Sequence, residues 1–158
     1  SGSLAALPQG SFNVSYALGE ALRCSLLGAA EPEAQRLWDE IERELTEEPR
    51  PPFTAPLLVA LRGRPAPPAQ MQRILRALDA DPRCAVRSAA LELRSAAIPG
   101  SAAAAQSALR SSCWREQARA LALLARLGET PDPDAKLPSF LRRVPQDPSR
   151  GPFIPDRE

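Results

Sequence analysis

Regularly spaced arginines are the residues of this sequence whose type and position best suit a chemical role. Arg62, Arg94 and Arg126 recur at an interval of 32 residues, and Arg87 and Arg119 share that interval. A guanidinium binds carboxylate or phosphate groups through paired hydrogen bonds, so a row of arginines along one face predicts a ridge that binds an acidic ligand. The alternative is that these side chains are solvated or make contacts between neighbouring parts of the fold.

Enzyme chemistry finds little support in the other polar residues. The chain has no histidine, which excludes Ser-His-Asp and Cys-His nucleophiles, histidine-bound zinc and an imidazole switch near neutral pH. Glu40, Glu44 and Glu47 fall on an outward helical stripe, and Asp132 and Asp134 lack the Gly and Glu of a calcium loop. The sequence contains no glycine-rich phosphate loop and no nucleophile elbow. We therefore expect neither an enzyme nor a bound cofactor or metal.

The cysteines and tryptophans are predicted to be structural. Cys24, Cys84 and Cys113 form no C-x-x-C pair, which argues against a metal knuckle and a disulfide framework. We expect free, buried thiols, although the sequence leaves open that two of them meet in the fold. Trp38 and Trp114 lie on apolar helix faces, so core packing is predicted; an exposed tryptophan that anchors an interface is the alternative.

Composition favours an all-helical fold. The chain has 28 Ala and 22 Leu in 158 residues, with only 4% aromatic residues. Its 18 prolines must separate helices or lie in a tail, because a proline inside a helix costs roughly 3 kcal/mol. The net charge of +1 hides an asymmetry: residues 1–50 carry four Arg against nine acids, and residues 51–130 carry eleven Arg against five. An acidic start and a basic middle suit docking or self-association.

Seven helices are predicted from apolar residues at helical spacing and from the caps and breaks between them. Asp81-Pro82 is expected to open the fifth, with Asp as cap and Pro in the first turn. The predicted ranges are 14–27, 33–47, 54–62, 69–78, 83–97, 101–109 and 113–127, with a further turn near 136–143. The expected buried face of the fourth helix is Met71, Ile74, Leu75 and Leu78. That of the seventh is Trp114, Ala118, Leu121, Leu124 and Leu127.

The chain is expected to form one helical domain, 14–128, between a loose N-terminal segment, 1–13, and a proline-rich tail, 129–158, that is packed on the domain or extended. Ser1-Gly2-Ser3 looks like a cloning remnant, so a signal peptide or lipid anchor upstream is left open and localisation stays undetermined, with the cytoplasm slightly favoured. No apolar run approaches the roughly 20 residues of a membrane span.

Two stretches of the chain repeat each other. Arg, Ala, Leu and Arg coincide at four of nine positions when residues 86–94 are set against 118–126. Helix lengths, caps and breaks agree at the same period, which indicates a true repeat. Each helix pair has too little core to be stable alone, so neighbouring pairs must stack.

The repeats resemble the HEAT family of its short variety, with a period of about 30 residues. Asp81-Pro82, Val86-Arg87, Ala90 and Leu93 look like a second helix of such a repeat, and the stretch 114–128 is similar to the next one. The resemblance is good over 68–128 and thin over 14–63. It implies a right-handed α-solenoid of antiparallel helix pairs, tied by a ladder of Asp and Arg. Arg87 and Arg119 match the arginine position of that ladder, and Cys113 stands where the next aspartate would be.

These observations predict an all-α, HEAT-like α-solenoid of seven to eight helices that acts as a non-catalytic scaffold or adaptor for another protein. The proposed partner-binding residues are Arg62, Arg87, Arg94, Arg119 and Arg126, with an acidic or extended segment as ligand. A nucleic-acid-binding repeat is the first alternative, disfavoured because interleaved aromatics and lysine clusters are missing. The second is a secreted or lipid-anchored assembly factor of a larger complex.

Overall fold

The computed structural model describes residues 12–50 and 54–142, and within these ranges the protein is all-helical, as predicted. Seven helices of eight or more residues are followed by one of four. They are α1 (Phe12–Gly28), α2 (Glu31–Thr46), α3 (Thr54–Leu61), α4 (Pro68–Leu78), α5 (Cys84–Leu93), α6 (Ser101–Ala108), α7 (Trp114–Leu127) and α8 (Ser139–Arg142). No helix in the described part of the chain is long and apolar enough to cross a membrane.

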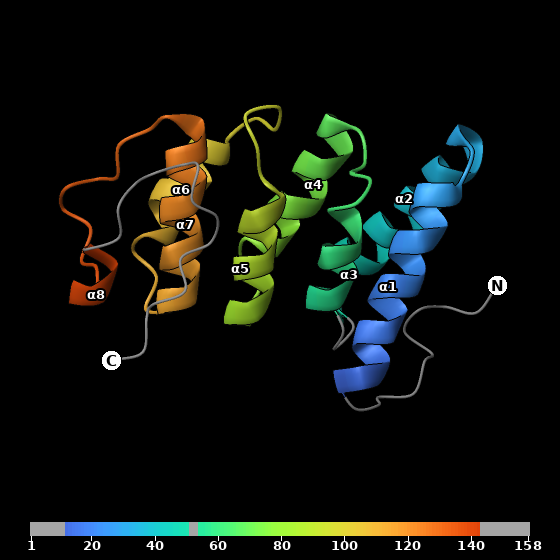
Figure 1. The fold of residues 1–158 in the computed structure, drawn as a ribbon, viewed down its shortest axis with the longest axis horizontal. Coiled ribbons are helices and arrows are strands. Elements are labelled where there is room, and N and C mark those ends of the chain that lie inside the picture. The colour runs from blue at the N-terminus through green and yellow to red at the C-terminus, as the bar shows by residue number, and fades with distance from the viewer. Residues whose placement is uncertain (1–11, 51–53, 143–158) are drawn as a thin grey trace.

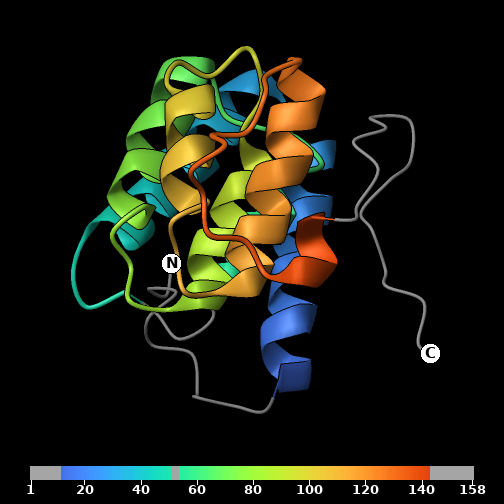
Figure 2. The ribbon, with the colours of Figure 1, turned by 90° about the vertical axis from the view of Figure 1, so that its left-hand side faces the viewer.

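The helices form two rows along the long axis of the molecule (Figure 1). In the first row, α3 packs between α1 and α5, and α5 packs against α7 on its other side. In the second row, α2 packs against α4, while α6 packs against α7. The view from the C-terminal side separates α2, α4 and α6 from α1, α5 and α7 (Figure 2). Residues that project outward from α3, α5 and α7, away from the second row, therefore share one face of the molecule.

Two hydrophobic clusters fill the space between the rows. The larger one extends from α1 to α5 and includes Trp38, Ile41, Leu58, Ile74 and Leu75, all buried. The smaller one lies among α5, α6 and α7, and three of its seven buried residues are alanines. Since α5 contributes to both clusters, it joins a large N-terminal core to a small C-terminal one.

The fourth helix agrees closely with its prediction, and the fifth does not. Met71, Ile74, Leu75 and Leu78 are all buried on α4. The fifth helix ends at Leu93, whereas the apolar spacing predicts continuation to residue 97. The chain turns extended after Leu93, and Pro99-Gly100 then leads into α6.

The predicted buried face of the seventh helix is right in part: Leu124 is buried and Leu121 and Leu127 pack against the smaller core, but the buried face is rotated away from Trp114. The buried residues of α7 are Glu116, Gln117, Ala120, Leu123 and Leu124. The two polar ones have partners: Gln117 Nε2 donates to the Leu109 carbonyl at 2.9 Å and to the Lys136 carbonyl at 3.2 Å. Because the amide satisfies two backbone acceptors, its burial costs little, and the helix turns Trp114 outward.

The proline-rich segment after α7 lies on the domain as far as the structure describes it. Gln106 on α6 donates to the Thr130 carbonyl and accepts from the Asp132 amide. Ala135 and Leu137 pack against the smaller core. Residues 143–158 of the predicted tail, and nearly all of the predicted loose start 1–13, fall outside the described residues.

Candidate functional site

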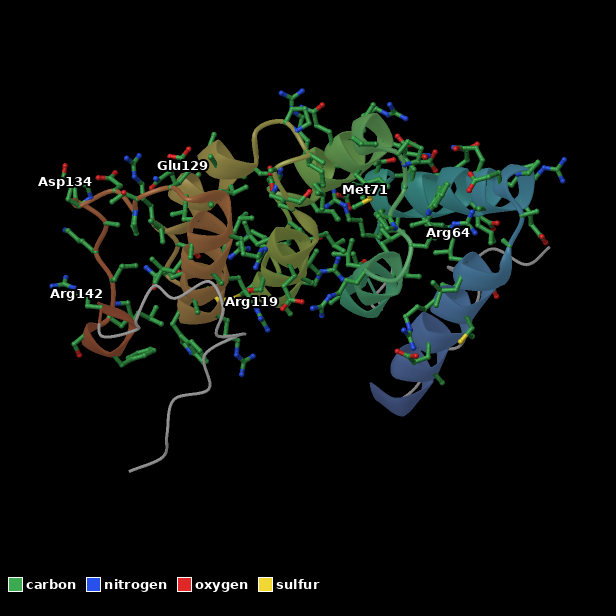
Figure 3. The ribbon with its side chains drawn as sticks, turned by 45° about the horizontal axis from the view of Figure 1, so that its top comes forward. Arg64, Met71, Arg119, Glu129, Asp134 and Arg142 are labelled. Carbon is green, nitrogen blue, oxygen red and sulfur yellow. A yellow bond between two sulfur atoms is a disulfide. The ribbon has the colours of Figure 1, made fainter. Side chains whose placement is uncertain are left out.

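Two of the predicted arginines meet at one carboxylate on the face formed by α3, α5 and α7. Arg62, directly after α3, contacts Glu92 Oε2 through Nη1 at 2.9 Å. Arg119 on α7 contacts Glu92 Oε1 through Nε at 2.6 Å. Figure 3 shows Arg119 at the boundary between α7 and α5. Glu92, on α5, thus links three helices, although sequence reasoning assigned it no role.

Three arginines of α7 lie in one line on the same face. Arg115, Arg119 and Arg126 are separated by four and seven residues, which places them on one helical stripe. We call these three the α7 arginine stripe. Arg115 and Arg126 are exposed, and neither has an ion-pair partner among the side chains that the structure describes.

Arg94 does not lie on an exposed ridge, so its predicted place beside Arg62 and Arg126 is wrong. Its side chain is buried, and Nη2 donates to both oxygens of Asp79 at 2.9 and 2.8 Å. The cause is the early end of α5: Arg94 leaves the helix in an extended conformation and turns inward. It connects α5 to the end of α4.

The Arg87 side chain is also held by contacts within the fold. Its Nε contacts Glu116 Oε2 at 3.0 Å, and its Nη1 donates to the Asp81 carbonyl at 2.6 Å. Ser111 donates its hydroxyl to the same Glu116 oxygen at 2.5 Å. Arg87 therefore connects α5 to α7, and the aspartate that it contacts offers its backbone carbonyl to it.

The hollow beside Arg87 has no excess of charge. It measures about 330 Å³ and lies among α5, α6 and α7. Arg87 and Arg110 line it together with Asp79 and Glu116. Arg110 is paired with Asp132 at 3.2 Å, and the other three have the partners given above. A hollow with paired, balanced charges favours neither an anionic nor a cationic ligand.

The two tryptophans differ. Trp38 is buried in the larger core, as predicted, and Nε1 donates to the Arg64 carbonyl at 3.3 Å. Trp114 is 47% exposed, so the predicted core position is wrong and the alternative of an exposed tryptophan holds. Its ring contacts Phe140 edge to face at 5.9 Å, with the Arg115 guanidinium 5.5 Å from the ring centroid. An exposed aromatic pair thus adjoins the α7 arginine stripe.

The cysteines overturn the prediction of three free, buried thiols. Cys84 and Cys113 form a disulfide, with Cα atoms 6.3 Å apart, and Cys24 is an exposed free thiol. Cys84 is the first residue of α5 and Cys113 is the N-cap of α7. The signal in the sequence was their position: both stand at the start of a helix, 29 residues apart, and α5 and α7 pack against each other.

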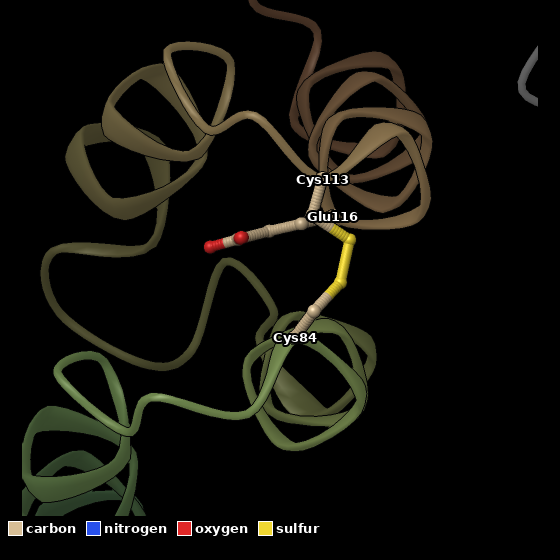
Figure 4. A group of neighbouring side chains, drawn as sticks. All are labelled: Cys84, Cys113 and Glu116. Atoms are coloured by element: carbon tan, nitrogen blue, oxygen red, sulfur yellow. A yellow bond between two sulfur atoms is a disulfide. The ribbon is translucent and has the colours of Figure 1, made fainter.

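A metal ion would compete with bonds that are already made. The ligand atoms of Cys84, Cys113 and Glu116 lie within 4.8 Å of one another. The sulfurs are bonded to each other, however, and the Glu116 carboxylate extends away from them toward Arg87 (Figure 4). Within the described residues this is the one such group, and its contacts favour the disulfide over a metal.

Asp81 is a buried carboxylate between α4 and α5. It accepts from the backbone N–H, Nε and Nη2 of Arg83 at 2.9, 2.9 and 2.8 Å, and from Nη1 of Arg50 at 3.3 Å. The hydrogen bonds from Arg83 hold the pKa of Asp81 below its ordinary value, against the opposing effect of burial. The predicted cap of α5 is shifted, because Arg83 occupies the N-cap position.

No protein-family model, curated protein or solved structure matches this chain. The HEAT-type resemblance therefore stays a prediction.

Proposed function

We propose that this protein is a non-catalytic scaffold of HEAT-like architecture whose α3, α5 and α7 face binds an acidic, extended segment of a partner protein. The observation that carries the proposal is the ratio of charges on that face. Arg62 and Arg119 share one carboxylate, Glu92, and the described part of the chain offers Arg115 and Arg126 no acidic partner.

The geometry suits a chain of carboxylates better than a single small anion. A guanidinium has five N–H donors, and Arg62 and Arg119 each use only some of these donors to bind Glu92. The exposed donors run along α7 and continue toward α3, so an extended segment would meet them in turn. Arg87 and Arg94 are left out of this surface, since both are held by carboxylates within the fold.

The two-row arrangement supports the architectural part of the proposal. In a solenoid, equivalent helices of successive pairs lie side by side and present one continuous surface. Here α3, α5 and α7 pack in sequence, and α2 packs against α4 in the other row. The polar contacts of Asp81 with Arg50, and of Arg87 with Glu116, then connect one pair to the next.

The test is affinity purification from the native source with two matched triple variants as baits. Replacing Arg62, Arg119 and Arg126 by glutamine should weaken binding of the captured partner by roughly ten- to a hundredfold, because each exposed charge-assisted contact contributes a modest amount. The control replaces three exposed arginines of the other row, Arg36, Arg43 and Arg76. It removes the same charge and should leave the dissociation constant, measured by calorimetry on the identified partner, unchanged.

A single substitution that is expected to strengthen binding adds a second test. Glu92→Gln frees Arg62 and Arg119 and removes the one carboxylate that competes with the ligand, so it should strengthen binding. If both triple variants weaken binding equally, net charge rather than this face is responsible and the proposal fails. If nuclease treatment removes the captured material, the nucleic-acid-binding alternative replaces it.

A further inference from the structure

We propose that Cys84 and Cys113 form a reversible dithiol–disulfide site whose reduction loosens α7 from α5. The bond joins the first residue of α5, a helix that contributes to both hydrophobic cores, to the N-cap of α7, which belongs to the smaller core (Figure 4). In addition to the backbone between α5 and α6, it links the first part of the domain covalently to the unit formed by α6, α7 and the segment that follows.

The helix starts around both sulfurs favour the reduced form. The Glu116 carboxylate, with an oxygen within 4.8 Å of both sulfurs, opposes it, but its charge is balanced by Arg87. A thiolate at a helix N-terminus is stabilised by the unpaired backbone N–H groups and the helix dipole. Cys84 and Cys113 both have this position. The Ser88 hydroxyl lies 3.8 Å from the Cys84 sulfur and can donate to it. A stabilised thiolate is a better leaving group, so such a disulfide is more easily reduced than one between ordinary thiols.

The reaction partner would be a low-molecular-weight thiol or its disulfide, because both cysteines are partly exposed. In oxidation, one cysteine thiolate attacks a sulfur of the small disulfide and expels a small thiolate. The second cysteine thiolate then attacks the protein sulfur of this mixed disulfide and expels the other small thiolate. Two electrons pass from the cysteines to the small disulfide, and the two cysteine protons end on the released thiols. Reduction is the reverse.

The other contacts between α5 and α7 are few enough that reduction of the disulfide can loosen α7. Besides the covalent bond, α5 and α7 are joined by two ion pairs, Arg87 with Glu116 and Glu92 with Arg119. The apolar part of this interface is the smaller, alanine-rich core. These contacts suffice to keep the cysteines near each other after reduction, while amides of α6 and α7 open more often.

Reduction would also act on the proposed binding face. The α7 arginine stripe moves with α7. Arg62 directly follows α3, which packs in the larger core and does not move with α7. The redox state therefore sets how well the two sets of arginines line up. This last consequence rests on the proposed function; the dithiol–disulfide site and the loosening of α7 do not.

The experiment uses the full chain without any partner. The protein is equilibrated in mixtures of reduced and oxidised glutathione, and the oxidised fraction of Cys84 and Cys113 is measured by alkylation and mass spectrometry. Amide hydrogen exchange is followed in the same samples. We expect a reversible titration of the native protein, with exchange in α6 and α7 at least about tenfold faster when reduced and exchange in α2 and α4 unchanged.

The Cys24→Ser variant is the matched control and should titrate like the wild type, since that thiol is exposed and unpaired. Cys84→Ser with Cys113→Ser should reproduce the exchange pattern of the reduced protein and lose its redox response. If that double variant does not fold, reduced and alkylated wild type provides the same comparison. The proposal fails if the bond is reduced only after denaturation, if oxidised glutathione does not form it, or if exchange in α7 is equal in both states.

Discussion

Replacing Asp81 by asparagine should lower the free energy of unfolding by about 3 kcal/mol, because it removes one partner of a buried ion cluster and leaves the others. The carboxylate is 1% exposed and accepts four hydrogen bonds from Arg83 and Arg50. Arg50 cannot easily move to water, since its Nε and Nη2 bind the carbonyls of Leu45 and Ala77, and its remaining carboxylate partner is the exposed Glu48 at 2.7 Å. An amide of the same shape would place N–H groups opposite a guanidinium.

Urea unfolding of the two proteins measures this difference, with Glu40→Gln as the control. Glu40 pairs with Arg43 at 3.9 Å on the surface of α2, where the Arg43 side chain is more than half exposed and that of Glu40 more than a third. Such a pair contributes about 0.5 kcal/mol or less. Equal losses in the two variants would show that Asp81 is no more than a surface carboxylate.

Asp81 also predicts how stability depends on pH. Its pKa is lower in the folded protein than in the unfolded chain, chiefly because Arg83 donates hydrogen bonds to the charged form. The stabilisation is therefore fully present above the unfolded value, about pH 4, and is lost as the pH falls through the lower folded value. Asp132 and Glu42 shift in the same direction. In urea unfolding, the gap between wild type and Asp81→Asn should narrow below about pH 4; a constant gap would contradict the assignment.

The apolar residues that the helices bury could largely be predicted from the sequence, and the buried polar residues could not. On α4 the apolar spacing identifies Met71, Ile74, Leu75 and Leu78 but misses Gln70, which is buried beside them. On α7 the buried face includes Gln117, whose amide binds backbone carbonyls of two other segments. Nothing local marks those distant acceptors, so the apolar pattern selected Trp114 in its place.

The 32-residue spacing of the arginines explains which residues of the site the sequence revealed and which it did not. Aligning the sequence with itself at an offset of 32 residues places Arg62, Arg94 and Arg126 at equivalent positions. The side chains that touch across α5 and α7 are separated by 29 residues for the disulfide and by 27 for Glu92 and Arg119. Residues 32 apart in the sequence are therefore not the ones in contact, so the alignment found the arginines without their carboxylates.

Arg94 is the clearest case of an arginine whose role is set by its surroundings. Its guanidinium is buried and binds Asp79, and its Nε is the one buried side-chain nitrogen or oxygen in the described residues that lacks a hydrogen-bond partner. Replacing it by alanine should cost about 2–3 kcal/mol of unfolding free energy, because the substitution removes the packed stem and leaves a cavity between α4 and α5.

Replacing Arg94 by methionine separates packing from charge. Methionine keeps most of the apolar stem and removes the unsatisfied Nε, while Asp79, which is 46% exposed, can return to water. We therefore expect the free energy of unfolding in urea to fall by no more than about 1 kcal/mol from the wild-type value, since buried ion pairs are often replaced by apolar side chains at little cost. The methionine variant should also retain the partner as well as wild type does. A methionine variant as unstable as the alanine variant would show that the ion pair itself holds the end of α5 to α4.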